Sequence, residues 1–200
     1  MSTHEPVVSQ QILDLIASKS DEQRSNRKMS PEVVEALKEC GFFKMLLPKQ
    51  WGGSEHRPQA FFAEQMRIAE ADMSTAWACG IVAVHAFQVA LMSEEAQREV
   101  YGDGPNALIS SSYNPVGAKA EMCEGGFMLS GRWGWSSGSD HCSWALLGGV
   151  IPGDGYRTFL IPRSQYVIED TWDVMGLQGT GSNDVFIETP IFVPEHRTHK

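Results

Sequence analysis

The first half of the chain has apolar residues at the three- and four-residue spacing that is typical of amphipathic helices. Val8, Ile12 and Ile16 follow this spacing and predict a helix over residues 7–16, with Leu13 off the apolar stripe. The rest of this half shows the same period, so we expect a helical unit here.

Helix boundaries are marked by residues that favour them. Ser30 is a suitable N-cap, Pro31 suits the first helical position, and Gly41 is a natural stop for this second helix. Pro58 is expected to begin a third helix, and Ser93, followed by two glutamates, is expected to cap a fifth. These signals divide the helical unit into several short helices.

The run over residues 76–92 is the most apolar part of the chain, but His85 and Gln88 interrupt it. That makes it marginal for a bilayer crossing, so we interpret it as a buried helix. Ser74 or Thr75 is the expected N-cap of this fourth helix.

Beyond Pro105 the apolar period falls to two and turn signals come close together, which indicates strands. The expected strands are residues 108–112, 119–123, 127–130, 144–150, 157–161, 166–170 and 184–193. Helices followed by antiparallel strands predict an α+β chain, with a helical domain over residues 1–103 and a β domain over residues 104–200.

Composition narrows the function classes. The chain is 42% hydrophobic and 20% charged, as expected for a globular protein with a substantial core. Its net charge of −9 argues against a nucleic-acid or anionic-membrane partner, because both need a basic face. Residues 1–6 have no basic region before an apolar run, so no secretory leader is expected.

The four cysteines form no CxxC pair and no zinc-finger spacing with histidine, so we expect reduced thiols in a cytoplasmic protein. Asp140, His141 and Cys142 are adjacent in sequence. Neighbouring side chains of an extended segment point to opposite faces, so we expect no metal site there.

Two polar segments are candidates for chemistry. His85 lies on an otherwise apolar helix, with Gln88 on the same face, and is either a hydrogen-bonded core histidine or the border of a ligand site. Residues 110–115 place Ser111 within a serine triplet at the end of a strand, where turn formation is an equally good explanation.

The segment over residues 131–141 is more unusual. Trp135, Ser136 and Ser137 place an indole beside two hydroxyl groups, a combination that suits a planar heterocycle. A purely structural turn with aromatic packing is the alternative. The glycine-rich residues 176–182 lack dinucleotide-binding and Walker spacing, although their amides, with Thr180 and Ser182, could hold a phosphate or a ring oxygen.

Taken together, several segments resemble the acyl-CoA dehydrogenase superfold, and more closely the flavin-dependent aromatic hydroxylases built on it. The matching segments are residues 47–53, 133–141, 161–166, 176–183 and 193–197. The similarity extends over essentially all 200 residues. It includes the hydroxylases of 4-hydroxyphenylacetate and of a steroid-derived phenol, and the steroid-ring branch is the nearer of the two, on residues 176–183 and 109–113. It implies a helical N-terminal domain followed by an antiparallel β-barrel middle domain.

The resemblance implies the oxygenase component of a two-component flavin-dependent monooxygenase. Such enzymes receive reduced flavin (FMNH2 or FADH2) from a separate reductase, form a C4a-hydroperoxide with O2, and hydroxylate a phenol ortho to its hydroxyl group. It further implies that Ser137 donates a hydrogen bond near flavin N5 and that Trp135 and Ser136 line the flavin ring. His85 then accepts or orients the phenol proton, and Ser111 is a second donor.

Alternatives remain within the same fold. An acyl-CoA dehydrogenase is disfavoured, because residues 111–117 and 135–138 depart from the motifs of those enzymes. The related oxygenases continue into a C-terminal helical bundle that closes the flavin site and supports a tetramer. This bundle is absent from the 200 residues, so a fragment or a non-catalytic interaction module is the other possibility. We expect such a chain to bind flavin weakly and to expose an apolar face.

Overall fold

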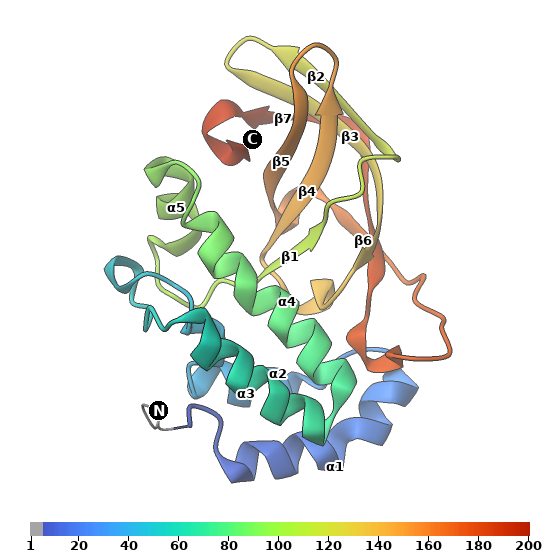
Figure 1. Ribbon diagram of the computed structural model, residues 1–200. Helices are drawn as coiled ribbons and strands as arrows, with labels where there is room; N and C mark the ends of the chain where they lie inside the picture. The colour runs from blue at the N-terminus through green and yellow to red at the C-terminus, as the bar shows by residue number, and fades with distance from the viewer. Residues whose placement is uncertain (1–5) are drawn as a thin grey trace.

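The computed structural model describes residues 6–200, which run from a helical part into a β part (Figure 1). The helices are α1 (Gln10–Asn26), α2 (Pro31–Glu39), α3 (Pro58–Ala71), α4 (Met73–Val89) and α5 (Glu94–Tyr101). The strands are β1 (Ile109–Ser112), β2 (Ala118–Cys123), β3 (Gly126–Ser136), β4 (Trp144–Ile151), β5 (Gly155–Pro162), β6 (Val167–Glu169), β7 (Asn183–Pro194) and β8 (Thr198–His199). The expected absence of a leader concerns residues that lie mostly outside this range. The domain boundary between residues 103 and 104 stays a prediction.

The β part consists of two sheets that pack face to face. Within residues 6–200 their strand orders are β1-β4-β5-β8 and β2-β3-β7-β6. Trp133 of β3 and Phe159 of β5 are fully buried in one cluster formed by both sheets. The expectation of a β-barrel is therefore wrong in one respect: no strand of one sheet pairs with the other in the described residues, so the barrel is not closed.

The expectation that all strands are antiparallel also needs correction. β1 pairs with β4 in parallel, with Ile109 opposite Trp144. Between β1 and β4 the chain forms the hairpin of β2 and β3, which belongs to the other sheet. After this long connection β4 runs in the same direction as β1. Parallel strands need a long connection of this kind, which the alternation pattern of single strands does not reveal.

α1 extends well beyond the predicted residues 7–16. Its buried positions include Leu13, which was expected off the apolar stripe, and Gln23 in the later turns. Gln23 Nε2 donates to Thr75 Oγ1 at 2.9 Å, and Gln23 Oε1 accepts from the Ser30 N–H at 2.9 Å. These turns are held by hydrogen bonds more than by apolar packing, so apolar spacing could not predict them.

The N-cap of α4 is Asp72, so the prediction of Ser74 or Thr75 is wrong. Asp72 Oδ2 accepts from both the N–H and the hydroxyl of Thr75 at 2.7 Å, and Oδ1 accepts from Ser20 Oγ at 2.9 Å. The carboxylate thus satisfies the free amide of Thr75 in the first turn and ties α4 to α1.

α4 joins the helical part to the β part. One side of it is buried against β1 and the helical core, where Cys79, Ala83 and His85 lie. Its other side is exposed, and α3, which lies beside α4, also has exposed apolar residues (Figure 1). These exposed side chains are Met73, Trp77, Val84, Phe87 and Leu91 of α4 and Phe62 and Met66 of α3.

The apolar face expected from the sequence is therefore confirmed. No helix in residues 6–200 combines the length and apolar character that a membrane crossing requires.

The position of the α4 cap can be tested by alanine substitution. Replacing Asp72 by Ala removes the acceptor for two groups of Thr75, so the free energy of unfolding should fall by about 1–2 kcal/mol. Ser74→Ala is the matched control and should change it by less than about 0.5 kcal/mol. Urea unfolding measures both, and equal losses would contradict the assignment.

Candidate functional site

A cavity of about 330 Å³ lies where α4 passes the ends of β1 and β3. The lining residues are Ile81, Val84, His85, Ser111, Ser112, Tyr113, Asn114, Gly134, Trp135 and Ser137. Four candidates chosen from the sequence therefore lie around one space: His85, Ser111, Trp135 and Ser137. Among the lining residues in the described part of the chain, none is Asp, Glu, Lys or Arg, so the cavity is uncharged while His85 is neutral.

His85 reaches the cavity from α4, and its ring is 2% exposed. Its Nδ1–H donates to the Ile109 carbonyl oxygen at 2.8 Å, because a carbonyl can only accept. In the neutral ring Nε2 then carries a lone pair and no proton. Burial lowers the pKa of His85 to about 4, so the ring is neutral at pH 7. His85 is thus both a satisfied core histidine and a cavity residue.

Trp135 owes its position to a bulge in β3. The pairing register between β3 and β7 shifts between Trp133 and Ser136, and Trp135 has a φ of 65°. An extra residue bends a strand, and a left-handed conformation costs a residue other than glycine about 1–2 kcal/mol. The indole is 73% exposed, so burial does not offset this strain. Strain of this kind is often stored at functional sites.

The two serines after Trp135 face opposite directions. Ser137 borders the cavity, whereas Ser136 is fully buried, does not line it, and its hydroxyl has no hydrogen-bond partner among the described residues. β3 ends at Ser136 after the bulge, and Ser137 is the first residue of the turn that follows, so the two side chains have different surroundings. Ser137 Oγ accepts from Trp77 Nε1 at 3.3 Å.

Thr180 and Ser182 lie behind Ser137 and do not line the cavity. Ser182 Oγ is 2.8 Å from Ser137 Oγ and 2.7 Å from Thr180 Oγ1, and all three residues are buried. The glycine-rich segment also supports β3 through its backbone, because the Thr180 carbonyl accepts from the Gly138 N–H at 2.9 Å.

The sequence did not point to Tyr113 or Trp77 as site residues, and it indicated Gln88 only as a residue on the same helix face as His85. Tyr113 meets the His85 ring edge-on with 6.1 Å between centroids, its hydroxyl donates to Gln88 Oε1, and burial raises its pKa to about 12. Gln88 and Trp77 lie three residues after and eight before His85, on nearby faces of the same helix. This helical spacing from His85 is the sequence pattern that could have predicted both residues to lie near the site.

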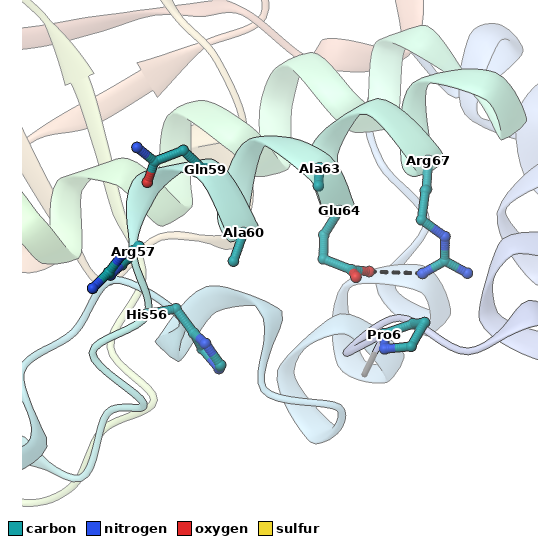
Figure 2. A pocket seen from close by; sticks show the side chains of 8 residues that line it. All are labelled: Pro6, His56, Arg57, Gln59, Ala60, Ala63, Glu64 and Arg67. Carbon is teal, nitrogen blue, oxygen red and sulfur yellow. Dashed lines mark hydrogen bonds and ion pairs between the residues drawn. The ribbon is translucent and has the colours of Figure 1, made fainter. Parts of the chain in front are cut away.

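A second cavity, of about 630 Å³, lies along α3 beside Pro6. Figure 2 shows Glu64 and Arg67 pointing toward each other there, joined by an ion pair of 2.8 Å. Glu64 Oε2 also accepts from the Val8 N–H at 3.1 Å, and Arg67 Nη1 donates to the Val8 carbonyl at 2.7 Å. These groups hold the N-terminal segment against α3, which is a structural role.

Comparison with known proteins first defines the class. Residues 7–103 match the family described as "Acyl-CoA dehydrogenase, N-terminal domain". The crystal structure of 3-HSA hydroxylase from Rhodococcus sp. RHA1 superimposes with a TM-score of 0.90 at 42% identity, covering 94% of this chain and 49% of that one. The chain therefore has the acyl-CoA dehydrogenase fold, with helices followed by sheets.

Curated relatives identify a group within that fold. The chain is 44% identical over 190 residues to the flavin-dependent monooxygenase oxygenase subunit HsaA of Rhodococcus jostii (strain RHA1), covering 93% of this chain and 49% of that protein. It is 35% identical over 191 residues to the oxygenase component of the FADH(2)-dependent resorcinol hydroxylase of Rhizobium sp. (strain MTP-10005), covering 93% and 46%. The chain belongs with these oxygenase components and spans about half the length of the curated relatives it matches.

The low pKa of His85 predicts a pH-dependent stability. Below its ordinary pKa of 6.5 the unfolded chain binds a proton that the folded protein, with a pKa of about 4, does not bind. The free energy of unfolding should therefore decrease as pH falls through this window, by about 2 kcal/mol from pH 7.5 to pH 5 through this residue alone. Urea unfolding at the two pH values measures the change.

His85→Asn is the control for this prediction. The amide can keep the donor to the Ile109 carbonyl but does not titrate, so the variant should lose about 2 kcal/mol less than the wild type between the two pH values. Equal pH dependence in both proteins would contradict a buried neutral His85.

The strain at Trp135 gives a second prediction. Trp135→Gly relieves the left-handed conformation and removes little buried surface, so the free energy of unfolding should stay unchanged or rise by up to about 1 kcal/mol. Trp135→Phe keeps the strain and a ring, and should leave it unchanged. Thermal or urea unfolding measures both. A loss of more than about 2 kcal/mol in the glycine variant would mean that the indole is needed for folding.

Proposed function

We propose that this chain contributes the reaction cavity of the oxygenase component of a two-component flavin-dependent monooxygenase, which hydroxylates a phenolic ring ortho to its hydroxyl group with reduced flavin and O2. The observation that carries the proposal is that His85, Ser111, Trp135 and Ser137 line one uncharged cavity. These residues come from α4, β1 and the end of β3, so the fold, and not local sequence, brings them together.

The residues at the end of β3 fit a reduced flavin. Trp135 offers an exposed indole for a planar ring, held there by a strained backbone, and Ser137 offers a hydroxyl at the edge of the cavity. When bound, reduced flavin supplies the electrons that activate O2. The name of the FADH(2)-dependent relative and the acyl-CoA dehydrogenase fold both support this cofactor. FMNH2 and FADH2 share the ring that these residues would contact.

His85 is suited to orient a phenol. Its Nε2 accepts a hydrogen bond from the phenol O–H, because Nδ1 already donates to Ile109. A phenol has a pKa of about 10, and His85 has a pKa of about 4, so the proton stays on the phenol before reaction. The hydrogen bond fixes the hydroxyl and raises electron density at the ortho carbon, and Ser111 gives a second polar contact.

The cavity offers no Lys or Arg among the lining residues of the described chain, and a neutral phenol needs no cation. The names of the relatives also support the oxygenase over an acyl-CoA dehydrogenase or a non-catalytic module.

The partners follow from the same proposal. An oxygenase component needs a separate flavin reductase as its source of reduced flavin, together with O2 and the phenol. We further propose a homo-oligomer and a cytoplasmic location, the latter supported by free thiols at all four cysteines. Cys79 and Cys142 are buried, and burial raises the pKa of both thiols, so neither is a reactive thiolate.

Two substitutions at the cavity test the proposed roles. With reduced flavin, O2 and a phenol, His85→Asn should lower catechol formation by about 100-fold while O2 is still consumed and released as hydrogen peroxide. Ser137→Ala should raise the yield of hydrogen peroxide at the expense of product without changing the affinity for the phenol. Chromatography of the catechol and a peroxidase assay measure both products.

The outcomes separate the alternatives. Identical effects of the two substitutions would contradict the separate roles of His85 and Ser137. Reduction of bound oxidised flavin by an acyl-CoA would favour the dehydrogenase. Failure to bind any flavin would favour the non-catalytic module.

A further inference from the structure

Tyr113 bounds the cavity beside His85. It is the first residue after β1, lines the cavity, and is 37% exposed. Its ring meets the His85 ring edge-on, with 6.1 Å between the centroids and 67° between the planes. Aromatic rings at this separation are in direct contact. A phenol bound to His85 therefore lies beside the Tyr113 ring and not between the two rings.

The backbone of Tyr113 is held against the sheet. Its carbonyl oxygen accepts from the Tyr156 hydroxyl at 3.0 Å. The same oxygen approaches Gly148 of β4 so closely that a Cβ at Gly148 would be only 2.3 Å from it. In the turn that follows, Asn114 Oδ1 accepts from the Val116 N–H at 3.2 Å. These contacts leave the main chain of Tyr113 little room to withdraw from the cavity.

The side chain of Tyr113 is held from α4. Its hydroxyl hydrogen-bonds with Gln88 Oε1, one helical turn after His85. Ser111 is also close to this hydroxyl, because Ser111 and Gln88 both oppose the rise in the pKa of Tyr113 that burial causes. One helix thus carries both the imidazole proposed to bind a phenol and the amide that fixes the neighbouring ring.

The proposed phenol hydroxyl lies at the same end of the cavity as Tyr113. It binds His85 Nε2 and contacts Ser111, and Tyr113 lies against the first of these residues and close to the second. A substituent on the carbon next to the hydroxyl-bearing carbon comes nearest to Tyr113, whereas a substituent opposite the hydroxyl points away. The cavity of about 330 Å³ is small for a ligand site, so little space remains beside the hydroxyl.

We propose that Tyr113 is a specificity-determining residue that excludes phenols with a bulky substituent next to the hydroxyl group, and that Gln88 is a positioning residue that holds the Tyr113 ring in place. The inference rests on the proposed function and adds a substrate class to it, namely phenols with unsubstituted carbons on both sides of the hydroxyl. Gln88 does not line the cavity and acts through Tyr113.

Two isomeric phenols test this proposal. 2-Isopropylphenol and 4-isopropylphenol have the same atoms and are both neutral at pH 7, so they differ in where the bulk lies. Calorimetric titration of the 200-residue chain gives the two dissociation constants. Reduced FMN is present in excess and O2 is excluded, so no turnover occurs. The wild type should bind the 2-isomer about tenfold more weakly, the size expected when a few carbons do not fit a pocket.

Removing the ring should remove the preference. Tyr113→Ala opens the space beside the hydroxyl, so the ratio of the two dissociation constants should fall to about one, mainly through tighter binding of the 2-isomer. Tyr113→Leu also removes the ring while keeping an apolar side chain. It should lower the ratio in the same direction, which keeps the test valid if Tyr113→Ala does not fold.

The role of Gln88 is tested by a double-mutant cycle. Tyr113→Phe and Gln88→Leu each break the same hydrogen bond while keeping the ring, so each should lower the ratio by about threefold. The double variant should lower it no further than either single variant, because the interaction is already lost. A purely structural role of Gln88 would instead weaken the binding of both isomers equally and leave the ratio unchanged.

Phe87→Ala is the matched control. Phe87 is an exposed aromatic residue of the same helix, two residues after His85, and it does not line this cavity. Its removal should leave the ratio unchanged. Circular dichroism checks that each variant is folded.

The outcomes separate this inference from the proposed function. If the wild type binds neither phenol, the proposed phenol cavity is contradicted and this inference fails with it. If it binds both without preference, or if folded Tyr113→Ala keeps the preference, the role of Tyr113 is wrong and the proposed function stands. If only the variants without the ring lower the ratio, the role of Gln88 is wrong. A lowered ratio in Phe87→Ala would mean that general loosening of α4 sets the preference.

Discussion

The hydrogen bond from His85 to the Ile109 carbonyl joins the helical part of the molecule to the β part at the site itself. It brings α4 to β1 at 2.8 Å in a buried place, and the same contact sets the tautomer of the imidazole. One hydrogen bond therefore fixes both the position of the His85 ring and the ring nitrogen that is free to accept a hydrogen bond. Without this bond the buried ring would lose its partner, α4 would lose a polar contact with the sheet, and the acceptor at Nε2 would no longer be defined.

The other side of the cavity depends on backbone geometry. The bulge at the end of β3 turns Trp135 outward and leaves Ser136 inside, so adjacent residues of one short segment have different environments. The glycine-rich segment then contributes through hydrogen bonds behind Ser137. Its hydroxyl groups do not reach the cavity, but Ser182 Oγ lies within hydrogen-bond distance of Ser137 Oγ and of Thr180 Oγ1. One set of residues therefore lines the cavity, and a second set holds Ser137 from behind.

Much of this could be predicted from the sequence. Apolar spacing, caps and turns predicted most helices and strands, and the sequence also selected Trp135 and Ser137, which line one cavity with His85. Spacing could not predict the later turns of α1, where Gln23 is buried through hydrogen bonds, or the parallel pairing of β1, which depends on a distant strand. It also could not separate Ser137 from Ser136, because a bulge and its effect on side-chain direction arise from pairing with β7.

The exposed apolar side chains of α3 and α4 affect how this chain behaves in solution. Its net charge of −9 makes copies repel one another, which opposes contact between these apolar faces. Dissolved ions shorten the reach of that repulsion to about 8 Å at physiological ionic strength, while the attraction between apolar surfaces persists. Self-association of the 200-residue chain should thus increase with ionic strength, contrary to the behaviour of a complex held by ion pairs.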